Sequence, residues 1–127
     1  MTRSRFLAVA LVILAASTLV GTLSPVSAVA SPAYCSPTGD YCIAVKRPSG
    51  RIVLRIGTFS FRRYTLCVTD PAGVRTCKPF GLKRTRAGLY ESKVHWRAHF
   101  PDRGPGLYRV RWRVSGANIG RILRFRR

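Results

Sequence analysis

Residues 64–80, YTLCVTDPAGVRTCKPF, contain two runs of alternating apolar and polar side chains, separated by a Pro-Ala-Gly triplet. A period of two is typical of β-strands, and the triplet suits a three-residue hairpin loop in which Pro sets a type I turn and Gly takes the left-handed position. Closing the loop with Asp70 opposite Val74 places Cys67 directly opposite Cys77. Hydrogen-bonded and open pairs alternate from the closing pair, so the two cysteines occupy an open pair, where Cα atoms approach closely enough for a disulfide.

The remaining two cysteines, Cys35 and Cys42, then pair with each other by elimination. An even number of cysteines in a short chain is typical of a disulfide framework when the chain is exported. Each bridge closes a short loop and is expected to stabilise the fold by about 2 to 3 kcal/mol. The alternative is a zinc site, but the gaps within the two pairs are wider than those of zinc knuckles. We therefore expect no metal and no cofactor.

The rest of the chain after residue 30 also has the pattern of strands. A first hairpin is predicted over 41–47 and 51–60, with a turn at Pro48-Ser49-Gly50. Its register stays open, because apolar residues are so frequent that either both faces are buried or a bulge shifts the phase. Further strands are expected at 89–100, 108–114 and 119–125. Six or seven short strands without a helical period predict an all-β fold, an antiparallel two-sheet sandwich.

In the strand predicted over 89–100, the even positions are expected to face the core and the odd positions to face solvent. The core set is Tyr90, Val94, Trp96, Ala98 and Phe100, and the solvent set is Glu91, Lys93, His95, Arg97 and His99.

The first thirty residues resemble an export signal. Arg3 and Arg5 precede an apolar run over 6–20, and the small-residue pattern ending at Ala30 suits signal peptidase. Cleavage is expected after Ala30, or alternatively after Ala28. The alternative is that the segment stays on the protein as a membrane anchor, because the apolar run approaches the length of a bilayer span. We expect a signal peptide over 1–30, one domain over 31–127, a secreted or envelope-associated protein, and membrane contact only through the leader before cleavage.

The last strands carry a resemblance to a known family. The segments GLYRVRWRVS (106–115) and GRILRF (120–125) are similar to the last two strands of bacterial immunoglobulin-like domains, in which a Gly-x-Tyr-x-Val-x-Trp strand precedes a closing hairpin. Asp102 and Tyr108 resemble a tyrosine corner, with wider spacing. The resemblance implies an immunoglobulin-like sandwich.

The same region resembles the end of the secreted copper-binding CopC-like domains. Members of that family carry Asp-Gly-His after this strand and a histidine at the mature N-terminus. This chain has Gly116-Ala117-Asn118 at the first place and begins at Ser31 or Val29 after cleavage. The resemblance therefore implies the fold and not copper binding.

The charge of the chain is strongly positive. The formal net charge is +19, and removal of residues 1–30 takes away two arginines and no acid, which leaves +17. Such a field attracts polyanions, including nucleic acid, anionic lipid and phosphate-bearing wall polymer, with an affinity that falls as salt rises. The alternative is a generic basic surface, because a GC-rich genome raises the number of arginine codons.

Three arginines, Arg109, Arg111 and Arg113, alternate with core positions and are expected about 6.7 Å apart along one strand face. Lys93 and Arg97 would add a parallel row if the two strands share a sheet. Guanidinium groups in such a row suit successive phosphates or carboxylates of an extended polymer. These five residues form the predicted polyanion-binding set.

The aromatic residues Trp96, Tyr108 and Trp112 have core parity, whereas a strand that stacks bases would expose them. We therefore expect wall polymer or lipid head groups rather than sequence-specific nucleic acid as the partner.

Catalysis is not expected. The chain lacks Gly-x-Ser-x-Gly and His-Glu-x-x-His patterns, and Glu91, His95 and His99 would lie about 13 Å apart at each step along a strand, too far for proton exchange. A secreted ribonuclease that uses His95 and His99 is the enzymatic hypothesis. Two non-enzymatic hypotheses also remain open: an adhesion or assembly module that binds a protein partner through a strand edge, and a cationic antimicrobial or toxin-like protein.

Overall fold

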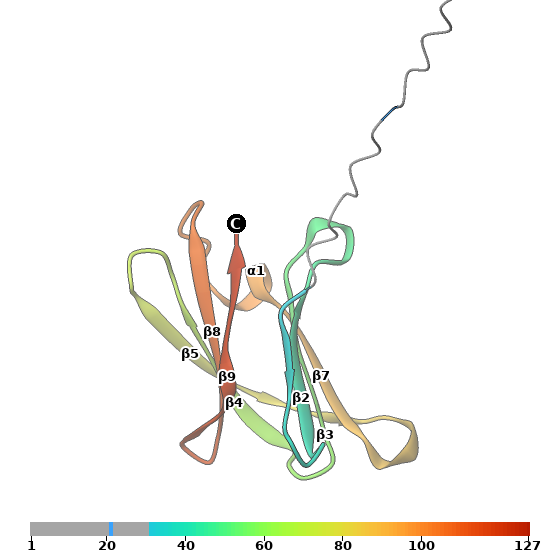
Figure 1. Ribbon diagram of the computed structural model, residues 1–127. Coiled ribbons are helices and arrows are strands. Elements are labelled where there is room, and N and C mark those ends of the chain that lie inside the picture. The colour runs from blue at the N-terminus through green and yellow to red at the C-terminus, as the bar shows by residue number, and fades with distance from the viewer. Residues whose placement is uncertain (1–20, 22–30) are drawn as a thin grey trace, which may run out of the picture.

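The computed structural model describes residue 21 and residues 31–127, so the predicted signal peptide and its cleavage site lie outside the described residues. The described chain forms two antiparallel sheets that pack face to face (Figure 1). The strands are β1 (Ala33–Cys35), β2 (Tyr41–Lys46), β3 (Val53–Thr58), β4 (Arg63–Thr69), β5 (Arg75–Gly81), β6 (Lys83–Arg84), β7 (Tyr90–His95), β8 (Leu107–Val114) and β9 (Ala117–Arg126). The chain also contains three short helical turns. Two are 3-10 helices, at Pro48–Gly50 and Arg86–Gly88, and the third is α1 at Trp96–His99.

The strand order is that of an immunoglobulin-like sandwich. The five-stranded sheet has the order β1-β2-β3-β7-β6, and the four-stranded sheet has the order β5-β4-β8-β9. With β2, β3, β7 and β6 taken as strands A, B, E and D, and β4, β8 and β9 as C, F and G, the chain follows the immunoglobulin arrangement. The seven long strands match the predicted ones in number. The two-residue β6 and three-residue β1 are additional, because runs this short carry no alternation that a sequence pattern can reveal.

The hairpin predicted over residues 64–80 is confirmed in detail. Asp70 N donates to Val74 O at 2.9 Å, and Cys67 lies opposite Cys77 in the ladder between β4 and β5. The two cysteines form a disulfide with their Cα atoms 4.0 Å apart. The second predicted disulfide is also present, and it joins the opposed residues Cys35 and Cys42 across β1 and β2. Both bridges are consistent with an oxidising extracellular environment.

The first hairpin has a single regular register. Ile43 lies opposite Ile56 and Val45 opposite Leu54, and all four side chains point into the core between the sheets. Val53 is also buried, but it lies outside this core cluster. The open question of register is therefore resolved without a bulge.

The prediction of a strand over 89–100 is wrong after His95. Trp96 N donates to Ile52 O at 3.1 Å, and Phe100 N then donates to Trp96 O at 2.8 Å, which closes one helical turn. Trp96 and Phe100 are buried as predicted, whereas Ala98 is exposed. The pattern is misleading because residues four apart share a face both in a strand and in a helical turn.

The core between the sheets is closed by aromatic side chains near α1. The rings of Tyr108 and Phe125 are stacked 5.1 Å apart, and Trp96 contacts both rings edge-on. Tyr108 Oη donates to Gly104 O at 2.8 Å and accepts from Arg103 N at 3.0 Å. This is the tyrosine-corner contact, in which a buried hydroxyl ties the start of a strand to the preceding loop.

In the part of the chain that is described, no helix combines the length and apolar character needed to cross a bilayer.

Candidate functional site

The row of arginines predicted on residues 107–114 lies on the outer side of the four-stranded sheet. In β8, Tyr108, Val110 and Trp112 are buried in the core. Because strand side chains alternate between the two faces, Arg109, Arg111 and Arg113 point away from the core.

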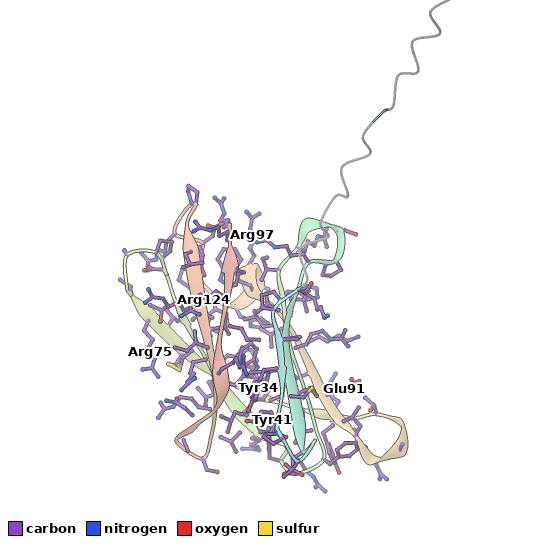
Figure 2. All side chains as sticks on the ribbon, in the orientation of Figure 1. Tyr34, Tyr41, Arg75, Glu91, Arg97 and Arg124 are labelled. Carbon is purple, nitrogen blue, oxygen red and sulfur yellow. A yellow bond between two sulfur atoms is a disulfide. The ribbon has the colours of Figure 1, made fainter. Side chains whose placement is uncertain are left out.

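Neighbouring strands add two arginines to the same face. Thr69 of β4 lies between Arg75 of β5 and Arg109 of β8, and Arg109 lies opposite Arg124 of β9. Figure 2 shows Arg75 and Arg124 on the side of this sheet that faces away from the five-stranded sheet. Adjacent strands are about 4.8 Å apart, so a row across the sheet crosses the row along β8 at Arg109. We call the set Arg75, Arg109, Arg111, Arg113 and Arg124 the arginine face.

The arginine face contains no acid. The strands β4, β5, β8 and β9 have neither aspartate nor glutamate in their sequences. Within residues 31–127, the ion pairs join Asp102 to Arg97 and Arg127, and Asp70 to Arg103. None of these pairs neutralises a member of the arginine face, whose positive charge is therefore available to an external anion.

Hydrogen bonds hold three of the guanidinium groups against the sheet. Arg75 Nη2 donates to Cys67 Sγ at 3.3 Å, and Arg111 Nη1 contacts Gly120 O at 3.4 Å. Arg113 Nη2 donates to Gly116 O in the turn between β8 and β9. These bonds reduce the side-chain entropy that a ligand would have to overcome in ordering the arginines.

A shallow groove of about 260 Å³ lies between the arginines of β5 and β8. Arg75, Arg109 and Arg111 line it, together with Thr69 and Asn118. The groove offers guanidinium, hydroxyl and amide groups, a set of donors that suits oxygen anions such as phosphate, sulfate or carboxylate.

Lys93 and Arg97 do not belong to this face, so the predicted parallel row does not form. Lys93 lies on β7 in the five-stranded sheet, opposite Arg55. Arg97 lies on α1 and pairs with Asp102 at 3.1 Å. The prediction for both residues rests on the parity of one long strand, but that strand belongs to the other sheet and ends at His95.

Arg75 and Arg124 are site residues that the sequence pattern does not identify. The hairpin register places Arg75 opposite Thr69, but its proximity to Arg109 depends on β4 lying next to β8. Arg124 alternates with the buried Leu123 and Phe125, so its outward position is readable from the sequence. The residue that lies opposite Arg124 in the ladder cannot be read from the sequence.

The two histidines of the ribonuclease hypothesis line different cavities. His95 lies on one with Trp96 and Arg97, and His99 lies on another with Phe80 and Ser92. The ring of His99 meets the ring of Phe80 edge-on at 5.1 Å. Among the described residues, no group of three His, Cys, Asp or Glu side chains is arranged to hold a metal ion.

The strand order and the arginine face are thus the observations from which a function can be inferred. Comparison of the chain with protein-family models, with curated proteins and with solved structures found no match.

Proposed function

We propose that this protein is an exported, non-enzymatic sandwich domain whose arginine face binds an anionic polymer outside the cell, such as a phosphate-bearing envelope polymer. The observation that carries the proposal is the arrangement of five arginines on one acid-free sheet face, with Arg109 directly opposite Arg124. Like charges in opposed positions destabilise a ladder, so this pair costs stability unless an anion binds there.

The spacing of the arginine face suits a repeating anion. Neighbouring arginines along β8 lie about 6.7 Å apart, and those on adjacent strands lie about 4.8 Å apart. A guanidinium group offers a planar fork of donors to phosphate or carboxylate oxygens. An extended polymer that lies on the sheet can therefore contact several arginines at once, and each contact releases counterions.

Recognition of bases is not part of the proposal. The aromatic residues next in sequence to the arginines, Tyr108, Trp112 and Phe125, are at most 4% exposed, so none can stack on a base. The ligand is recognised by its charge and spacing.

The leader and the disulfides support an extracellular location. Residues 1–30 have the composition of a signal peptide, and all the cysteines of the chain are paired in the two bridges. A polymer of the cell envelope or a cell surface is then the polyanion that this protein meets.

The test is binding to linear polyphosphate and to heparin over a range of salt concentrations. The triple variant R75E/R109E/R124E should lose binding, and the salt slope of log K should fall by about one for each lost phosphate contact. The matched control is K83E/R84E/K93E, which changes the net charge equally on exposed residues of the five-stranded sheet. Equal losses in the two variants would show that net charge alone binds the polymer.

Three results would favour a different function. A stoichiometric protein that stays bound at high salt would indicate an adhesion or assembly module. Dye leakage from anionic vesicles would indicate a membrane-active cationic protein, and cleavage of RNA that disappears in H95A would indicate a ribonuclease.

A further inference from the structure

A second basic site lies at one end of the sandwich. Figure 1 shows that α1, the turn between β2 and β3, and the end of β9 meet at this end. A cavity of about 460 Å³ is formed by these three segments, and we call it the end cavity. Its volume lies within the range of about 300 to 1,000 Å³ that is typical of sites for small molecules.

The lining of the end cavity is strongly cationic. Its charged and titratable residues are Arg47, Arg51, His95, Arg97, Arg126 and Arg127. No acidic residue lines it. Asp102 lies beside the cavity and pairs with Arg97 at 3.1 Å and with Arg127 at 2.6 Å. One carboxylate therefore holds two of the five arginines in position.

The other three arginines have no acidic partner among the described residues. Within residues 31–127, Arg47, Arg51 and Arg126 form no ion pair with a carboxylate. Arg47 Nη2 donates to the main-chain oxygen of Arg126, which links the two sheets across the cavity. The positive charges of these three lining residues repel one another, and the repulsion is relieved best by an anion with more than one charge.

The wall of the end cavity also contains apolar surface. Ile52, Trp96 and Ala98 contribute to it. Trp96 is 1% exposed, and among the described residues its Nε1 has no hydrogen-bond acceptor.

We infer that the end cavity binds a phosphate monoester whose organic part is about the size of glycerol or one sugar. Such a phosphate carries nearly two negative charges at neutral pH, which offset part of the positive charge of the three arginines without a carboxylate partner. The cavity has room for the body of the ester beside its apolar wall. A free monoester and the terminal phosphate of a longer chain share this chemistry. The inference is independent of polymer binding by the arginine face, which uses other residues.

The experiment is an NMR titration with glycerol 3-phosphate at physiological ionic strength. The chain has two tryptophans, so its spectrum contains two indole N–H signals, which the variant W96F assigns. We expect the Trp96 signal to shift to saturation and the Trp112 signal to stay, because Trp112 does not line the end cavity. A linear shift without saturation, or equal shifts of both signals, would overturn the inference.

A pair of variants tests the arginines directly. R51Q/R97Q should weaken binding of glycerol 3-phosphate by about tenfold or more, the loss expected when at least one charge-assisted contact disappears. The matched control, K83Q/R84Q, removes two exposed charges from β6 and should leave binding unchanged. Thermal melting of each variant checks that the fold is intact. Equal weakening in both variants would contradict a specific site.

Two further experiments distinguish the possible sources of the ligand and distinguish the end cavity from the arginine face. Competition by linear polyphosphate, but not by ring-closed trimetaphosphate, would assign the end cavity to chain ends, and absence of competition would assign it to free monoesters. R75E/R109E/R124E should keep binding glycerol 3-phosphate. Loss of polymer binding alone in that variant would show that the two sites are distinct. Failure of the wild-type protein to bind the monoester would overturn the inference about the end cavity and would leave the proposal for the arginine face unaffected.

Discussion

Arg109 of β8 and Arg124 of β9 lie directly opposite each other on the outer side of the four-stranded sheet, with no acidic residue in any strand of that sheet. Opposed like charges are unfavourable in a ladder. The pair therefore opposes folding and, under the proposed function, favours binding of an anion.

Replacement of one member of this pair should separate stability from binding. R124E converts the repulsion into a cross-strand ion pair, so we expect the free energy of unfolding in urea to rise by about 0.5 kcal/mol. The same variant should bind polyphosphate more weakly, with a salt slope smaller by about one or more. R84E is the control, because Arg84 lies opposite Tyr90 and has no opposed charge to lose. A loss of stability in R124E would contradict the repulsion.

The two disulfides should differ in their structural importance. Each closes a short loop, and removal of either bridge should cost about 2 to 3 kcal/mol through the entropy of the unfolded chain. Cys67 is 1% exposed and lies in the middle of the four-stranded sheet. Cys35 and Cys42 are exposed, and they lie near the edge of the five-stranded sheet. C67A/C77A should therefore cost more than C35A/C42A, because it also leaves a small cavity. Urea unfolding of the two double variants measures the difference, and equal costs would show that packing around Cys67 contributes nothing.

The protein should lose stability in alkali through Tyr64. Burial raises the pKa of Tyr64 to about 12 from 10.0, against the opposing effect of its hydrogen bond with Ser92. The contribution of Tyr64 to stability is fully present below pH 10, because its side chain is then protonated in both the folded and the unfolded state. It is lost between about pH 10 and 12, because the unfolded chain then releases the proton more readily. The difference in stability between wild type and Y64F should shrink over this window by an amount on the order of 2 kcal/mol. A constant difference from pH 9 to 12 would exclude this linkage.

The tyrosine corner should contribute to stability through its hydroxyl. Tyr108 is 0% exposed, and Tyr108 Oη bonds both Gly104 O and Arg103 N. Y108F leaves both main-chain groups without that partner, so we expect a loss of about 1 to 3 kcal/mol in urea unfolding. The matched control is Y41F, because Tyr41 packs against the core only in part. Wild-type stability in Y108F would show that solvent replaces the hydroxyl at no cost.

Prediction from the sequence is most accurate where contacts are local. The ladder from Asp70 to Cys67 follows from a three-residue loop, because each pair in a tight hairpin is set by the pair before it. It is least accurate at residues 96–100, where Trp96 and Phe100 satisfy a strand and a helical turn equally well. The hydrogen bond from Phe100 N to Trp96 O and the exposure of Ala98 identify the helical turn.

The candidate site shows the same division. Arg109, Arg111 and Arg113 share a face because they belong to one strand, and a period of two is enough to establish that. The assignment of Lys93 and Arg97 to a parallel row depends on a shared sheet, and that condition fails. No alternation within a strand carries information about its neighbours.

The predominance of strands, the register of the hairpin over residues 64–80, both disulfides and the outward row on β8 were determined by the amino-acid sequence, because turn chemistry and side-chain alternation act over a few residues. The neighbours of each strand were decided by packing in three dimensions. The core brings β4 between β5 and β8, and thereby Arg75 near Arg109, although these two residues lie on strands that are not consecutive in the chain. Arg124 lies opposite Arg109 because the ladder of the β8–β9 hairpin shifts its register between Val110 and Trp112. Such pairing depends on how two apolar faces fit together, and many strand orders are compatible with the same local pattern.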